Sequence, residues 1–88
     1  MKTYEFDVVL KGTPGITDDQ ADALFTHGCD DGTPVIRDGL AWVHFDREAS
    51  SLEVAIHSAV SQVRSAGFVV SKVELDVNSA ASLGVQAD

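Results

Sequence analysis

Positive charge is scarce in this sequence. Six lysine and arginine residues accompany fourteen aspartate and glutamate residues, which gives a formal net charge of -8. A protein that binds nucleic acid needs basic side chains to meet the phosphates, and an anionic membrane surface makes the same demand. We therefore expect no direct contact with nucleic acid or with a membrane. The partner that this charge suits is a basic protein.

Cysteines and long apolar runs are scarce as well. Cys29 is the one cysteine, so the chain has no second cysteine for an internal disulfide. The first residues hold no apolar run of the kind that forms the core of a signal peptide. No stretch approaches the roughly 20 apolar residues that a membrane-spanning helix needs. We expect a cytoplasmic protein, because a reducing compartment is the ordinary place for a chain without disulfides.

The familiar motifs of catalysis and cofactor binding are missing. The sequence has no glycine-rich phosphate loop, no P-loop lysine and no dinucleotide fingerprint. One short segment groups residue types that can bind zinc, namely His27, Cys29, Asp30 and Asp31. No second paired motif completes a zinc site, and no nucleophile signature surrounds Cys29. We therefore predict a protein that is not an enzyme, with no catalytic residues, no cofactor and no metal.

Four segments have the pattern of β-strands. Residues 3–10 alternate apolar and polar side chains with a period of two, which is typical of a half-buried strand. A second strand begins at residues 35–37 and a third covers residues 40–45. Asp38-Gly39 between them predicts a hairpin, because both central positions of a type I′ turn require positive φ. A fourth strand is predicted over residues 68–77.

Two segments have the pattern of amphipathic helices. A capping box opened by Thr17 predicts the start of a short helix, and Gly28 predicts its end. A second capping box, formed by Ser50 and Glu53, predicts the start of a longer helix with apolar residues at helical spacing. The charged residues 46–48 before it are interpreted as a solvated loop.

The resulting order is strand, helix, strand, strand, helix, strand. This βαββαβ order predicts an α+β, ferredoxin-like fold, with a four-stranded antiparallel sheet and two helices on one face. We expect one domain over residues 1–77 and a short C-terminal tail over residues 78–88. The predicted core draws on strands and helices alike: Phe6, Val8, Leu24, Phe25, Val43, Phe45, Ile56, Val60, Val63, Val73 and Leu75.

Two surfaces are candidates for binding a partner. The period of two places Leu40, Trp42 and His44 on the sheet face opposite the helices, and an exposed patch with a tryptophan is typical of a contact surface. The alternatives are that the tail covers this face or that Trp42 packs alone at its rim.

The second surface has one sign of charge, because residues 12–36 contain no lysine or arginine. Its acids are Asp18, Asp19, Asp22, Asp30 and Asp31. The alternative is a solvated helix face whose first-turn acids complement the helix dipole.

Several stretches carry a resemblance to a known family. They are Phe6-Asp7-Val8-Val9, Ala23-Leu24-Phe25 with Gly28-Cys29-Asp30-Asp31, Phe45-Asp46-Arg47-Glu48-Ala49, and Ser51-Leu52-Glu53 with Ala55-Ile56 and Ser58-Ala59. Together they span about residues 4–77 and resemble small bacterial and phage proteins with a ferredoxin-like N-terminal domain, for which no activity is established. In many of those proteins a helix-turn-helix follows this domain. Residues 80–85 are similar to the start of such a module, but the 88 residues contain no recognition helix, so the resemblance does not imply DNA binding.

Three hypotheses follow for the function. The first is a non-enzymatic protein-protein interaction module, of the antitoxin type or a phage-type inhibitor of a nucleic-acid-handling or defence complex. The second is a self-associating accessory domain, a possible homodimer, from a lineage of helix-turn-helix transcription regulators. The third, ranked last, is a small enzyme that uses Cys29 or a histidine.

Overall fold

The computed structural model describes residues 2–13 and 15–75. The elements are β1 (Lys2–Leu10), α1 (Asp18–Thr26), β2 (Gly32–Arg37), β3 (Leu40–Ala49), α2 (Leu52–Ser65) and β4 (Val70–Leu75). The predicted tail, and the predicted domain boundary after residue 77, lie outside the described residues. Within the described part, neither helix has the length and hydrophobicity needed to span a bilayer.

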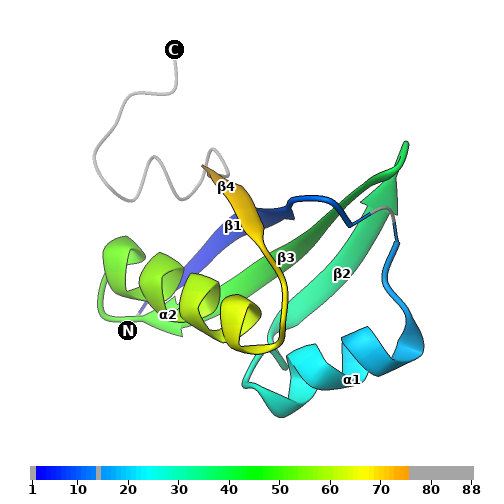
Figure 1. Ribbon diagram of the computed structural model, residues 1–88. Coiled ribbons are helices and arrows are strands. Elements are labelled where there is room, and N and C mark those ends of the chain that lie inside the picture. The colour runs from blue at the N-terminus through cyan, green and yellow to red at the C-terminus, as the bar shows by residue number, and fades with distance from the viewer. Residues whose placement is uncertain (1, 14, 76–88) are drawn as a thin grey trace.

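The four strands form one sheet in the order β2-β3-β1-β4. Every neighbouring pair is antiparallel, and β1 and β3 pair along almost their whole length at the centre. Figure 1 shows α2 beside the central strands and α1 below β2. The predicted α+β fold, with a four-stranded antiparallel sheet and two helices, is therefore confirmed.

One face of the sheet builds the core. Along β1 and β3 every second side chain is buried, and Phe6 stacks on Phe45 with the ring centroids 5.5 Å apart. Both helices contribute to the same cluster, α1 through Leu24 and α2 through a stripe that ends at Val63. Most of the predicted core is confirmed, since the following residues are buried or pack against the buried cluster: Phe6, Val8, Leu24, Val43, Phe45, Ile56, Val60, Val63 and Val73.

Two predicted core residues are exposed instead. Phe25 is 69% exposed, because α1 turns one narrow side to the sheet and Leu24 already occupies it. Leu75 is 47% exposed at the end of the edge strand β4. Both predictions came from the spacing of apolar residues along one element, which does not fix the exact rotation of a short helix or the cover over an edge strand.

The predicted turns and caps are largely confirmed. Asp38 and Gly39 both have positive φ, as a type I′ hairpin requires. The Thr17 hydroxyl accepts a hydrogen bond from the backbone N–H of Gln20, and the Gln20 side-chain Oε1 accepts one from the backbone N–H of Thr17. Gly28 has a φ of 95°, which lets the chain leave α1 in a Schellman turn and carry the next residue into the core.

The region around the start of α2 corrects two predictions. The N-cap of α2 is Ser51, whose hydroxyl accepts from the backbone of Val54, so the predicted capping box at Ser50 and Glu53 is wrong. The interpretation of residues 46–48 as a solvated loop is also wrong, because β3 continues to Ala49. The alternation of β3 overrides the low strand propensity of charged residues here.

Candidate functional site

The sheet face opposite the helices carries the predicted contact residues. Leu40, Trp42 and His44 alternate along β3 on this face; Leu40 is exposed, whereas Trp42 and His44 are half-buried. Val9 lies directly across from Trp42 on β1 and is almost fully buried. We call this surface, made by the outward side chains of the four strands, the open face.

A shallow hollow of about 360 Å³ lies at the hairpin end of the open face. Val9, Leu40 and Trp42 supply the apolar part of its lining. Charged residues complete the lining: Asp7, Arg37, Asp38 and Glu74. Three apolar residues, including a tryptophan, and four charged residues thus line the hollow, a mixture that also occurs in protein-binding sites.

Acidic residues surround His44, which lies next to the hollow and farther from the hairpin along β3. Nδ1 of His44 lies 2.6 Å from Oδ1 of Asp7 and donates its proton, since an ionised carboxylate only accepts. Nε2 of His44 lies 3.7 Å from Oδ1 of Asp46. The hydrogen bond to Asp7 raises the pKa of His44, and the charges of Asp46 and Glu5 act in the same direction, while partial burial opposes them.

Three of these side chains form the one group of potential metal ligands found among residues 2–13 and 15–75. Ligand atoms of Glu5, His44 and Asp46 lie within 4.8 Å of one another. The sequence pattern pointed instead to the segment 27–31. There, Cys29 is buried in the core and the carboxylate of Asp31 is bonded to an arginine, so the structure does not assemble a ligand group from that segment.

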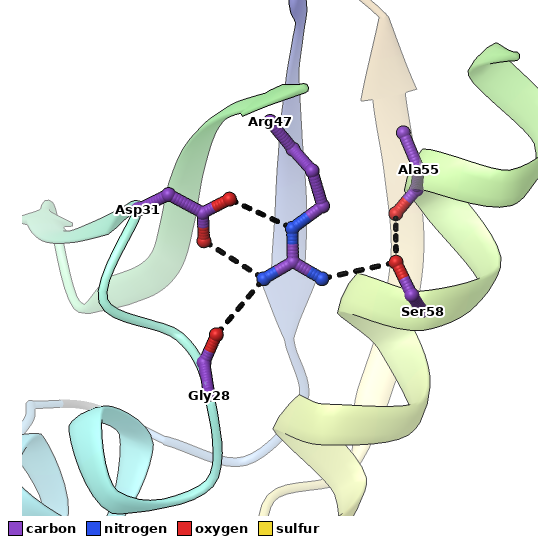
Figure 2. A network of polar contacts seen from close by, with 5 residues as sticks. All are labelled: Gly28, Asp31, Arg47, Ala55 and Ser58. Carbon is purple, nitrogen blue, oxygen red and sulfur yellow. Dashed lines mark hydrogen bonds and ion pairs between the residues drawn. The ribbon is translucent and has the colours of Figure 1, made fainter. Parts of the chain in front are cut away.

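The arginine that binds Asp31 is Arg47, and Figure 2 shows it between the loop after α1 and helix α2. Its Nε and Nη2 donate to the two carboxylate oxygens of Asp31 at 2.8 and 2.7 Å. Nη2 also donates to the carbonyl of Gly28 at 3.1 Å, and Nη1 donates to Ser58 Oγ at 3.0 Å. One side chain of β3 thereby ties down both the α1–β2 loop and α2.

Arg47 is 8% exposed, so its charge depends on these partners. The hydrogen bonds with Asp31 raise the pKa of the guanidinium, which also lies 4.9 Å from the centre of the Phe45 ring. Burial raises the pKa of the neighbouring Cys29 thiol, although Arg47 opposes it. This arrangement describes a structural clamp with a buried thiol beside it. The clamp was not predicted, although the alternation of residues 41–45 continues to Arg47 and is a signal of its burial.

The predicted acidic surface is only partly assembled. Asp18, Asp19 and Asp22 are exposed on α1, and Asp30 is exposed in the loop that follows. Asp31 differs, because its carboxylate is engaged by Arg47. The exposed acids therefore form a helix surface that is separate from the open face.

A second hollow, of about 600 Å³, lies between α2 and the end of β4. Its apolar lining residues are Leu52, Ile56, Val60 and Leu75. Glu53 and His57 also line it. Leu75 is the last residue of the chain that the structure describes. The described contacts do not show what lies over this groove, and no function is assigned to it.

Comparison with known proteins adds no relative. No protein-family model, no curated protein and no solved structure matches this chain at a significant level. The case for a function therefore rests on the geometry of the open face.

Proposed function

We propose that this chain is a non-enzymatic protein-interaction domain, and that its open face binds a partner protein of basic character. The observation that supports this proposal is the position of Trp42. A large aromatic side chain lies half-buried beside a hollow on the sheet face that neither helix covers, next to the exposed Leu40. Tryptophan at the centre of a concave apolar surface is the residue type that contributes most to protein binding.

The charge of the open face supports a basic partner. Glu5, Asp7, Asp46 and Glu74 project from the two central strands and β4 on the same side. The whole chain has a net charge of -8, so the long-range field also attracts a positively charged surface. Electrostatic complementarity of this kind speeds association and rejects acidic competitors.

We place the protein in the class of antitoxins and phage-type inhibitors of nucleic-acid-handling or defence complexes, acting in the cytoplasm. Proteins that handle nucleic acid need basic side chains to meet the phosphates, and an acidic domain can occupy such a surface. The arrangement β2-β3-β1-β4 supports a ferredoxin-like fold as part of the same proposal.

The test is affinity capture from the source cells with three forms of the protein. The wild type is compared with Leu40→Ser, which removes an exposed apolar group from the hollow, and with Val54→Ser. Val54 is 50% exposed on α2 and serves as the matched control, because it lies on the other side of the molecule. Circular dichroism and thermal unfolding verify that each form is folded.

We expect one dominant partner that the wild type and Val54→Ser capture and Leu40→Ser loses. Binding should weaken between low and moderate salt, since screening reduces the attraction between exposed charges. Equal capture by all three forms would exclude the open face as the binding surface. Recovery of the protein itself alone, with a dimer in analytical ultracentrifugation, would favour the self-associating domain instead.

A further inference from the structure

The block of polar side chains around His44 on the open face has a regular geometry. In the register of β1 and β3, Glu5 lies directly opposite Asp46, and Asp7 lies directly opposite His44. All four side chains leave the sheet on the same side, because each pair is two residues from the next. Cross-strand neighbours have Cβ atoms about 4.5–5.5 Å apart, close enough to share one ion.

The orientation of His44 is the feature that singles this block out from an ordinary group of surface acids. Its Nδ1 is held by Asp7 at 2.6 Å, which fixes the ring and leaves Nε2 directed toward Asp46. A histidine that binds a metal in proteins usually gives its other ring nitrogen to a carboxylate or a carbonyl in just this way. Asp7 thus occupies the place of the carboxylate that orients a metal-binding imidazole.

The block also concentrates carboxylates that can bind a cation. Glu5 and Asp46 lie in directly opposed positions, and their ligand atoms lie within 4.8 Å of each other and of a ring nitrogen of His44. Asp7 lies opposite Glu74 on its other side, which adds further negative charge. Lys72, the lysine of β4 on this face, is drawn to Glu74 at 2.9 Å.

From these observations we infer that Glu5, His44 and Asp46 form a binding site for one divalent transition-metal ion, with zinc as the representative ion and Asp7 as the positioning residue. The imidazole selects zinc and its neighbours in the transition series over magnesium and calcium, which prefer oxygen ligands alone. Three protein ligands leave a coordination position for water or for a further ligand. This inference does not rest on the proposed partner, since the site is complete within one chain.

The experiment is a zinc titration by isothermal calorimetry on the untagged 88-residue chain, stripped with a chelator and desalted, at pH 7.5. The test variants are His44→Gln and Asp46→Asn, which remove one ligand each. The matched controls are His57→Gln and Asp22→Asn, which remove the same groups from exposed positions on the helices. Urea unfolding shows whether each variant is folded, and two independent ligand variants keep the test valid if one of them is not.

We expect one zinc ion per chain in the wild type and in both controls, and a loss of affinity of at least tenfold in each ligand variant. Asp7→Asn should lose about tenfold, because the imidazole keeps its place less well. Magnesium at the same concentration should produce no binding heat. Absence of saturable one-to-one zinc binding by the wild type, or undiminished binding by folded His44→Gln, would overturn the inference.

Discussion

Replacing Arg47 with methionine should destabilise the fold strongly while leaving the open face unchanged. The side chain is 9% exposed and makes four hydrogen bonds, two of them to the carboxylate of Asp31. Methionine keeps much of the apolar volume over the Phe45 ring but removes every donor. Asp31 and the Gly28 carbonyl then lose their charged partner.

The expected loss in the free energy of unfolding depends on the Asp31 charge that Arg47→Met leaves without a partner. Breaking a buried ion pair on one side typically costs 3–5 kcal/mol, because the other charge is left without compensation. The Asp31 side chain is 31% exposed and can recover part of its hydration. We therefore expect a loss of about 2–4 kcal/mol in the free energy of unfolding, within a total of about 4–13 kcal/mol for a chain of this length.

Urea unfolding at 25 °C measures this loss, followed by far-ultraviolet circular dichroism and by the fluorescence of Trp42, the single tryptophan. With a slope of roughly 1 kcal/mol per molar urea, the midpoint should fall by about 2–4 M. Arg37→Met is the matched control, since Arg37 is exposed, and it should stay within about 0.5 kcal/mol of the wild type.

Adding Asp31→Asn to each background tests whether the two residues act as a pair. The substitution should cost clearly less in Arg47→Met than in the wild type. The reasoning is refuted if Arg47→Met unfolds at the same urea concentration as Arg37→Met. Equal costs of Asp31→Asn in both backgrounds would show that Arg47 stabilises the fold through its other contacts.

Three further predictions concern single groups. With chelator present, Asp7→Asn should lower the pKa of His44 in an NMR titration, because it removes the main cause of the raised value. Because the pKa of His44 is raised in the folded state, protonated His44 stabilises the fold fully below the ordinary pKa of 6.5, and this stabilisation is lost as the pH rises through the folded-state pKa. The wild type should therefore be more stable than Asp7→Asn at pH 5.5, and the difference should shrink at pH 9. The Cys29 thiol, 3% exposed and with a pKa raised by burial, should react with a disulfide reagent at pH 8 in urea but not in the folded protein. Gly39→Ala should lower the free energy of unfolding by about 1 kcal/mol, because φ is 75° at this position and alanine adopts positive φ less readily than glycine. The added methyl group meets no neighbour, so the backbone conformation alone causes this cost. An unchanged urea midpoint would contradict the assigned turn.

Local rules were sufficient to predict most of the fold. The period of two over residues 3–10, the Asp38-Gly39 turn and the capping box at Thr17 act within a few residues, and each has a direct physical cause. The rules gave wrong results where a distant contact decides the outcome. Arg47 lies in a strand because Asp31, sixteen residues away, and α2 compensate its charge in the core.

Some residues of the candidate site could likewise be predicted from local patterns, and others could not. Leu40, Trp42 and His44 were predictable, because one strand with a period of two is enough to place them on a common face. The acids around His44 were not, because their position depends on the register between β1 and β3. A shift of one residue would turn Glu5 and Asp7 toward the core, so that register had to be seen in three dimensions.

β1 and β3 therefore contribute to the core on one side of the sheet and carry the polar residues of the candidate site on the other. Phe6 and Phe45 stack beneath the sheet, while the neighbouring Glu5, Asp7 and His44 project above it. Because the side chains of adjacent residues do not share an environment, changes on the open face leave the packing of the core almost untouched. The strands that fix the fold are thus free to change their outward residues, and the Arg47 clamp holds the loop and α2 in place without using that surface.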